Sequence, residues 1–322
     1  MVDLVPPPLK AGQVRIDVSY CGICGSDIHF RNHLPLGTVM GHEVVGRVSE
    51  ISEGVSGWDK GERVAVFPVE PCGACPRCHA GWSNICEQRQ FGIGGSMAWG
   101  GYAQSLVALP SMLFRLPDSL DDRAAALIEP LTVSLHAVKR SSASPDAAAL
   151  VMGAGTIGLM TVLALRAMGH DNIAVIEPNA ARLAHISRLG VHALESGDAD
   201  ARVTAALGGP PATIFECAGY PGALVDAVRM VAPHGEIMVL SAPTNPVPLP
   251  QWQLMLKEAR LNSAIFYSRD EFAEAIDLLA SGRVPADALP VSVMPLTDAA
   301  RALDELLVTN TPHMKVLLQA DA

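Results

Sequence analysis

The stretch AALVMGAGTIG, residues 148–158, decides the fold because it joins an apolar strand to a glycine turn and the start of a helix. In this G-x-G-x-x-G pattern, the first glycine permits a tight turn and the second lets the backbone approach a pyrophosphate at the helix N-terminus. The third glycine lets helix and strand pack closely. The stretch therefore predicts a dinucleotide-binding turn. The predicted cofactor-binding residues here are Gly153, Gly155, Thr156, Ile157 and Gly158.

An acidic residue follows at the distance that this fingerprint requires. The next apolar strand, NIAVIE (172–177), ends in Glu177, 19 residues after Gly158. A carboxylate there can accept hydrogen bonds from the ribose hydroxyls of an adenosine, and it would repel a 2′-phosphate. NAD is therefore favoured over NADP, although Arg182 lies five residues further on and weakens that preference. The alternative is a glycine turn with a chance acid.

Strands and helices alternate along the chain around this turn. The expected strands are AALVM, NIAVIE, VHALE, ATIFECA and GEIMVLS, and the expected helices are TIGLMTVLALRAMG, NAARLAHISRLG and GALVDAVRMV. Strands that are apolar on both faces and separated by helices are typical of a parallel, doubly wound sheet. Residues 129–266 are therefore expected to form an α/β domain of the Rossmann type, the NAD-binding domain.

The flanking segments have a different pattern. GQVRIDVSY (12–20) carries apolar residues at every second position, and EVVGRVSEI (43–51) is also rich in valine. Glycine and proline interrupt this region throughout, which is typical of a small, loop-rich β-barrel. We expect residues 1–128 and 267–322 to form this second domain.

The composition shifts near residue 121, where DDRAAALIEPLTVSLHAVKR (121–140) reads as helix. Proline lacks the N–H that a helix interior needs, so Pro130 is expected to break or kink this helix. After residue 267 the pattern predicts two helices and a final strand, MKVLLQ (314–319).

Charge and composition exclude several classes of protein. The net charge of −10 argues against nucleic acid or an anionic membrane as the main partner. No signal peptide is evident, so a cytoplasmic protein is expected. Residues 147–165 carry no charge and imitate a membrane span, but their glycines fit a buried strand, a turn and a buried helix better.

Four of the seven cysteines lie close together in PCGACPRCHAGWSNIC. Four thiolates on a short loop suit tetrahedral zinc in a closed, structural site, here a lobe of residues 70–88. An iron–sulfur cluster and unliganded thiols are the alternatives; the fourth cysteine comes later than in ferredoxins, and no second cysteine cluster follows. The predicted structural zinc ligands are Cys72, Cys75, Cys78 and Cys86.

A second group of candidate metal ligands is scattered along the chain. Cys24 lies in YCGICGSDIHF (20–30), and His42 and Glu43 lie in GHEVVG (41–46). Glu129 lies in LIEPLTVSLHA (127–137). Taken singly, the cysteine could be a small buried hydrophobe, the histidine a hydrogen-bonded turn residue and Glu129 a helix-surface acid. Sequence spacing alone does not join them.

The combination of motifs resembles the zinc-dependent medium-chain alcohol and polyol dehydrogenases. CGICGSDIH, GHEVVG, GERV, the four-cysteine lobe, EPLTVSLHA and VMGAGTIG occur in the order found in that family. The resemblance implies a chaperonin-10-like catalytic domain, a Rossmann domain with the active site between them, two zinc ions per chain and assembly as homodimers or homotetramers. Relative to the family, the chain begins about one strand pair late, and the segment between His29 and Gly41 is short.

The resemblance also implies a role for each candidate. Cys24 and His42 match catalytic zinc ligands. Glu43 matches an acid that in this family either contacts the zinc ligands without binding the metal or becomes a ligand itself. Glu129 stands where classical alcohol dehydrogenases have a cysteine. An acid at this place resembles the sorbitol, threonine and butanediol dehydrogenase branches, in which it either binds zinc or holds a zinc-bound water, so Glu129 is an expected ligand. Three further residues are expected to be catalytic: Ser26 takes the substrate proton, Asp27 orients His42, and His29 is the outer end of the proton path.

The predicted function is the reversible oxidation of a secondary alcohol or polyol to a ketone, with hydride transfer to NAD. Two alternatives stay open: an NADPH-dependent aldehyde or ketone reductase of the same family, and a zinc- and nucleotide-binding protein without turnover. Cys21 is expected to be a small buried residue rather than a ligand. The specific substrate has no readable signature in the sequence.

Overall fold

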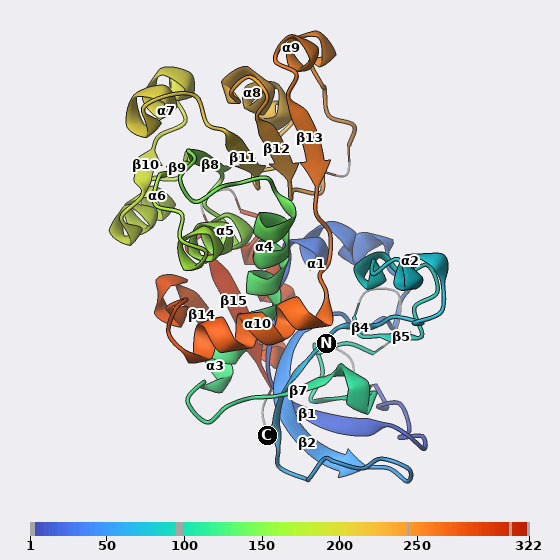
Figure 1. The fold of residues 1–322 in the computed structure, drawn as a ribbon. Helices are drawn as coiled ribbons and strands as arrows, with labels where there is room; N and C mark the ends of the chain where they lie inside the picture. The colour runs from blue at the N-terminus through green and yellow to red at the C-terminus, as the bar shows by residue number, and fades with distance from the viewer. Residues whose placement is uncertain (1–3, 95–98, 244, 309–310, 321–322) are drawn as a thin grey trace. The chain divides into compact units, whose positions relative to one another are not determined.

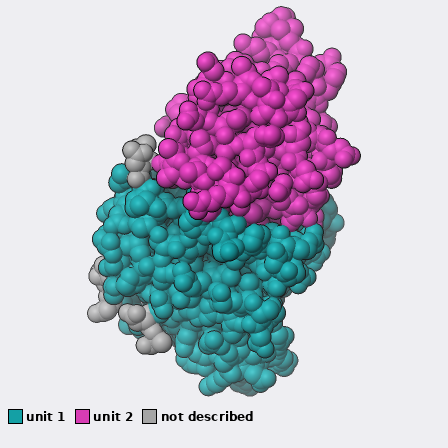
Figure 2. Space-filling view, turned by 90° about the vertical axis from the view of Figure 1, so that its left-hand side faces the viewer, with its two compact units in different colours: residues 1–129, 268–322 teal, residues 130–267 magenta. Residues whose placement is uncertain are grey.

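The structure is a computed structural model that describes residues 4–94, 99–243, 245–308 and 311–320. The chain divides into two compact units, which Figure 2 shows in different colours. Unit 1 comprises residues 1–129 and 268–322, and unit 2 comprises residues 130–267. Among the residues described, no helix combines the length and the apolar character needed to cross a membrane.

Unit 2 is a doubly wound, six-stranded parallel sheet with the order β10-β9-β8-β11-β12-β13. Its strands are β8 (Ala149–Met152), β9 (Ile173–Ile176), β10 (His192–Leu194), β11 (Thr213–Glu216), β12 (Glu236–Val239) and β13 (Arg260–Ser263). The central strands β8, β9 and β11 are buried along their whole length, as the apolar pattern predicts. The predicted parallel sheet is therefore confirmed.

Helices connect these strands (Figure 1). They are α5 (Thr156–Ala167), α6 (Ala180–Ile186), α7 (Ala199–Leu207), α8 (Ala223–Met230) and α9 (Gln251–Leu256). The strand order reverses beside β8, because β9 and β10 lie on one side of it and β11 to β13 on the other. The carboxyl end of β8 is therefore the switch point at which doubly wound sheets bind ligands.

Unit 1 is built on a seven-stranded sheet with the order β14-β15-β1-β2-β3-β7, and β6 also pairs with β1. Its strands are β1 (Val14–Gly22), β2 (Glu43–Ile51), β3 (Arg63–Val66), β6 (Ser105–Ala108), β7 (Leu113–Arg115), β14 (Val291–Pro295) and β15 (Lys315–Gln319). Strand β15 pairs with β1, so Cys21 lies opposite Leu318. The end of the chain thus completes a sheet that begins at residue 14.

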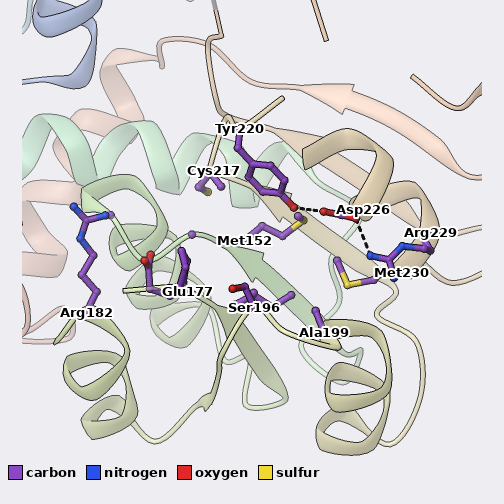
Figure 3. Close-up of a pocket in the computed structure, with 15 residues that line it drawn as sticks. Met152, Glu177, Arg182, Ser196, Ala199, Cys217, Tyr220, Asp226, Arg229 and Met230 are labelled. Atoms are coloured by element: carbon purple, nitrogen blue, oxygen red, sulfur yellow. Dashed lines mark hydrogen bonds and ion pairs between the residues drawn. The ribbon is translucent and has the colours of Figure 1, made fainter. Parts of the chain in front are cut away.

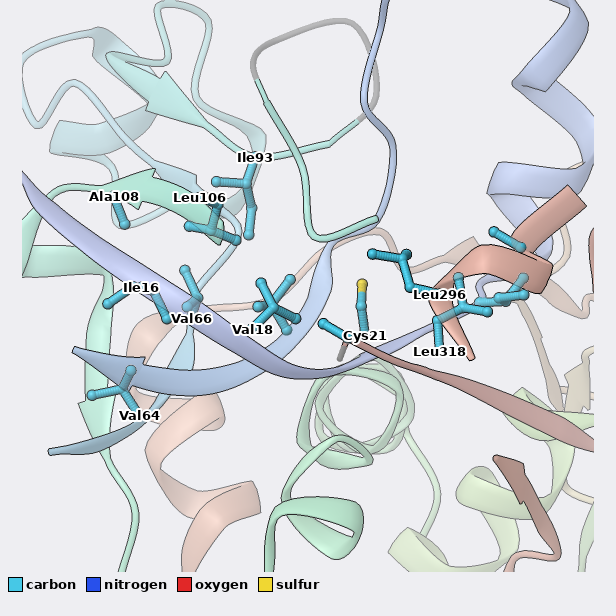
Figure 4. Close-up of a cluster of buried hydrophobic side chains, with 14 of the residues drawn as sticks. Ile16, Val18, Cys21, Val64, Val66, Ile93, Leu106, Ala108, Leu296 and Leu318 are labelled. Atoms are coloured by element: carbon cyan, nitrogen blue, oxygen red, sulfur yellow. The ribbon is translucent and has the colours of Figure 1, made fainter. Parts of the chain in front are cut away.

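The core of unit 1 is a cluster of mostly aliphatic side chains, which come from alternate residues and so from one face of each strand (Figure 4). Cys21 is fully buried in this cluster, close to Val18 and Leu318. Burial, followed by the charges of Asp27 and Glu43, raises the pKa of the Cys21 thiol well above its usual range, so the thiol stays neutral. The expectation that Cys21 is a small buried residue is confirmed.

The predicted helix over residues 121–140 is two helices, α3 (Asp122–Ala125) and α4 (Ile128–Arg140). The expected break at Pro130 is wrong, because the interruption lies at residues 126–127 and Pro130 sits in the first turn of α4. N–H groups of the first turn have no partner within the helix, so a proline there removes no hydrogen bond. Two further helices of unit 1 are α10 (Arg269–Ala280) and α11 (Ala299–Glu305).

Candidate functional site

Cys24 stands at the start of the short helix α1 (Gly25–Phe30) and is held there by Asp27. The Asp27 carboxylate reaches back one turn and accepts the Cys24 N–H on Oδ2 at 3.0 Å, as acids do in a capping box. The Asp27 side chain is only 5% exposed. The hydrogen bond therefore holds the backbone of Cys24 and occupies one oxygen of a buried carboxylate.

The structure brings His42 and Glu43 next to Cys24. Gly41, with φ of +96°, turns the chain immediately before His42, and Glu43 begins β2. One potential ligand atom each from Cys24, His42 and Glu43 lies within 4.8 Å of the others. A thiol, an imidazole and a carboxylate at this separation fit the donor set of a zinc site that keeps an open position.

Glu129 does not belong to this close group of three. It stands in the first turn of α4 and is buried, with 8% of its surface exposed. Its charge still acts on the group. Burial lowers the pKa of His42, but the hydrogen bond to Cys24 and then the charges of Cys24, Glu129 and Asp27 outweigh it and raise that pKa well above its ordinary value. Glu129 is therefore close enough to influence the site.

Lys315 is a partner of Glu43 that sequence reasoning missed. Its Nζ forms an ion pair with Glu43 Oε2, both side chains are 1% exposed, and Nζ also donates to the Ile23 carbonyl at 2.9 Å. A buried carboxylate without a cation would be costly, so the pair neutralises Glu43 inside the unit. The available signal was one lysine inside the apolar strand KVLLQ.

Tyr102 is a second residue that sequence reasoning missed. Its hydroxyl donates to Asp27 Oδ2 at 2.7 Å, while Asp27 Oδ1 lies 3.7 Å from His42 Nδ1. Burial, and after it the charge of Asp27, raises the pKa of Tyr102 well above its usual value, so the hydroxyl remains a donor. Ser26 is half-buried, and His29 on the same helix is exposed to solvent.

The four cysteines of the predicted lobe converge. Their Sγ atoms lie within 4.8 Å of one another, and the Cys72–Cys86 separation is 3.5 Å. The helix α2 (Pro76–His79) begins after Cys75 and carries Cys78, and backbone N–H groups point at the sulfurs of Cys72 and Cys86. This geometry fits a closed tetrahedral zinc site.

The thiols of the lobe differ in acidity, which also fits a metal site. Hydrogen bonds from the backbone of Glu87 and Cys78 lower the pKa of Cys75 to about 6. Burial and hydrogen bonds to Cys75 and Cys86 raise the pKa of Cys78 to about 12. Thiols must lose their protons to bind zinc, and the backbone N–H groups that point at these sulfurs favour the thiolate form.

Unit 2 contains a pocket of about 520 Å³ at the carboxyl ends of β8, β9 and β11 (Figure 3). The predicted glycine turn lines it: Gly153 has φ of +91°, Gly155 precedes α5, and a Cβ at Gly155 would meet no atom within 4 Å. The backbone at Gly155 is therefore open to a ligand. Figure 3 shows Glu177 and Arg182 on one side of the pocket and Asp226 and Arg229 on the other.

Two buried glutamates shape this pocket. Glu177 accepts N–H groups of Ala154 at 2.7 Å and Asn179 at 2.8 Å. Glu216, which the sequence reasoning missed, accepts those of Ala218 at 2.8 Å and Gly219 at 2.7 Å. The Glu177 carboxylate thus holds the loop that follows β9, and the Glu216 carboxylate holds the loop that follows β11. Both loops contribute residues to the lining of the pocket.

Comparison with known proteins places both units in one family. The family described as alcohol dehydrogenase GroES-like domain matches residues 10–118, and that described as zinc-binding dehydrogenase matches residues 156–281. The fold and the two cysteine-containing sites thus define a zinc-dependent dehydrogenase with a GroES-like, that is chaperonin-10-like, domain and a Rossmann domain.

Individual relatives specify the branch. The chain is 33% identical to 2-dehydro-3-deoxy-L-galactonate 5-dehydrogenase of Pseudoalteromonas atlantica, over 97% of this chain and 93% of that protein. It is 30% identical to (R,R)-butanediol dehydrogenase of Bacillus subtilis, over 97% and 94%. An alcohol dehydrogenase of Escherichia coli CFT073, crystallised with NADH, superposes with a TM-score of 0.88 at 30% identity and covers 97% of this chain and 93% of its own.

The chain therefore belongs to the zinc-dependent medium-chain alcohol and polyol dehydrogenases. This membership confirms the resemblance, the two-domain fold class and the prediction of an oxidoreductase that acts on alcohols.

Proposed function

We propose that the protein is an NAD-dependent zinc enzyme that reversibly oxidises a secondary alcohol or a polyol to a ketone. The observation that carries the proposal is the convergence of Cys24, His42 and Glu43 in unit 1, since they are the donors that a catalytic zinc needs. The glycine-lined pocket of unit 2 supports the cofactor part of the proposal. We assign unit 1 as the catalytic domain and unit 2 as the NAD-binding domain.

The residues of unit 1 divide the work of the reaction. Bound zinc would supply a Lewis acid for the substrate oxygen, and bound NAD would accept the hydride. Cys24 and His42 would hold the metal, and Glu43 or Glu129 would complete its ligands. The Ser26 hydroxyl accepts the substrate O–H proton, and His29, which is exposed, delivers that proton to solvent. The products are a ketone, NADH and one proton, so atoms and electrons balance.

The four-cysteine lobe takes the second zinc. Cys72, Cys75, Cys78 and Cys86 leave no open coordination position, so this metal stabilises the lobe and does not contact substrate. Two zinc ions per chain are therefore expected in the active protein.

Activity with NAD and with NADP tests the proposal directly. With a panel of diols, sugar alcohols, amino alcohols and cyclic alcohols at mildly alkaline pH, we expect NADH formation with kcat/KM at least about tenfold higher for NAD than for NADP, a difference of about 1.4 kcal/mol. The reason is that the buried Glu177 carboxylate lines the pocket and would repel a 2′-phosphate.

Two other outcomes would each support a different function. A preference for NADP would favour a reductase of the same family, for which Arg182 in the same pocket is the supporting observation. NADH binding without turnover across the whole panel would favour a binding protein without catalytic activity.

A homodimer or homotetramer is a further part of the proposal. Strand β13 has a neighbouring strand on one side only among the described residues, and large apolar side chains beside it are exposed: Trp252 66%, Leu256 66% and Leu261 40%. An uncovered edge strand with apolar neighbours is a ready surface for pairing with a second copy. All seven cysteines are free, which fits the proposed cytoplasmic location.

Charged substitutions at this edge should separate the copies. We expect the wild type to elute as a dimer or tetramer, and Leu261→Lys combined with Leu256→Glu to shift it to a monomer, measured by light scattering during size-exclusion chromatography. Leu307→Lys, at an exposed apolar residue of unit 1, is the matched control. A wild-type monomer at micromolar concentration would contradict this part of the proposal.

A further inference from the structure

Tyr102 contacts both of the features that fix His42. We propose that Tyr102 is a positioning residue of the catalytic zinc site: its hydroxyl holds the Asp27 carboxylate and its ring holds the turn at Gly41, so that the His42 imidazole is presented to the metal in one orientation. The inference rests on the proposed function, because it concerns the zinc that Cys24 and His42 would bind.

The hydroxyl of Tyr102 determines how Asp27 is used. Asp27 Oδ2 receives two donors, the Tyr102 hydroxyl at 2.7 Å and the Cys24 N–H at 3.0 Å. Its other oxygen, Oδ1, lies 3.7 Å from His42 Nδ1. Because the carboxylate is 5% exposed, water cannot replace a lost donor freely. Both firm donors are on one oxygen, so the second oxygen is directed at the histidine.

The ring and backbone of Tyr102 hold the segment that leads into His42. Gly41 has φ of +96°, and a Cβ placed on it would lie 2.5 Å from Cδ1 of the Tyr102 ring. The Tyr102 N–H donates to the Met40 carbonyl at 2.9 Å, and the Gly101 N–H donates to the Gly41 carbonyl at 2.8 Å. Residues 101–102 are therefore bound along the turn that sets the direction of His42.

The two contacts act on one ligand from two directions. The backbone hydrogen bonds of residues 101–102 fix where the His42 side chain starts, and the Asp27 carboxylate faces its ring, with Oδ1 3.7 Å from Nδ1. Carboxylates that hold a metal-binding histidine in this manner change metal affinity by about 10–100-fold. A phenylalanine at position 102 would keep the ring contact and remove only the hydrogen bond, so the substitution isolates the role of the hydroxyl.

Zinc release provides the test. The wild type, Tyr102→Phe, Asp27→Asn and the double variant would each be loaded with zinc and mixed with a chromogenic chelator. We expect Tyr102→Phe to release one of its two zinc ions about tenfold faster than the wild type, with the other ion unchanged. Because Tyr102 acts through Asp27, the double variant should release that ion no faster than Asp27→Asn alone.

Tyr20→Phe is the matched control, since Tyr20 is another half-buried tyrosine of unit 1, on β1. It should release both ions at the wild-type rate. The inference would be overturned if Tyr102→Phe released zinc at the wild-type rate or released both ions faster. It would also be overturned if the double variant released the ion faster than Asp27→Asn alone. A wild type that binds only the zinc of the four-cysteine lobe would instead refute the proposed function.

Discussion

Cys24→Ala should remove one of two zinc ions and lower kcat/KM about a thousandfold or more. The thiol is one of only three ligand groups that the structure gathers at this site among its described residues. Lewis-acid catalysis by a metal is worth several kcal/mol of barrier, and each 1.36 kcal/mol is a factor of ten in rate. Zinc analysis by inductively coupled plasma mass spectrometry and steady-state kinetics with NAD measure the two effects on the same preparation.

Two other cysteines serve as controls for this experiment. Cys21 is three residues away but is buried in the core of unit 1, so Cys21→Ala should keep both zinc ions and most of the activity. Cys75→Ser should lose the other zinc, because Cys75 belongs to the four-cysteine lobe. If Cys24→Ala kept both zinc ions, or if Cys21→Ala lost one, the assignment of the catalytic ligands would be wrong.

Gly158→Ala should be the most disruptive small substitution in the glycine turn. A Cβ at Gly158 would lie 1.9 Å from the backbone oxygen of Gly153, and backbone cannot rotate away as a side chain can. Overpacking of this kind costs about 3 kcal/mol or more, which for a domain of this size lowers the unfolding temperature by roughly 6–12 °C. Thermal unfolding followed by circular dichroism measures the loss.

Gly155→Ala is the matched variant, with the opposite pattern of effects. Its Cβ would meet no atom within 4 Å, and its φ of −71° suits alanine, so the unfolding temperature should not change. The added methyl group would stand in the opening over the turn, where a pyrophosphate would approach the backbone. NADH binding, measured by fluorescence titration, should weaken about tenfold. Wild-type affinity in Gly155→Ala would show that the cofactor phosphates do not pass over this turn.

Local patterns were sufficient for most of the fold. The strand β2 spans the nine residues that its valines predict, and β8, β9 and β11 fall inside the predicted apolar runs. Strand β13 was not predicted, because its sequence RLNS is polar. The strand lies at the edge of its sheet, where apolar residues are not required on every side. The helix α7 has only Val203 and Leu207 buried, so its apolar pattern is too weak to read.

The site divides in the same way between local and long-range signals. Gly153 and Gly155 belong to one turn and Glu177 ends the next strand, and the structure places these three around one pocket, whereas Thr156, Ile157 and Gly158 are not among its lining residues. Lys315 contacts Glu43, and Tyr102 contacts Asp27, from positions that are distant in the chain. No rule based on sequence spacing could therefore indicate that they belong to the candidate zinc site. Glu216, like Glu177, is an acidic residue at the end of an apolar strand, and this pattern could have indicated it. It was missed because it does not belong to a known sequence motif.

The placement of Lys315 has a consequence for the order of folding. Its ammonium group donates to the carbonyl of Ile23, 292 residues earlier in the chain, and neutralises Glu43 at the start of β2. Unit 2 is continuous, from residue 130 to residue 267, so it can form as soon as the ribosome has released it. Strand β1 can pair with β2 early, but its pairing with β15 must wait for the end of the chain, because contacts of such long sequence separation form late. During synthesis, unit 2 can therefore be complete while the buried charge of Glu43 still lacks its cation, which arrives only when the last strand docks.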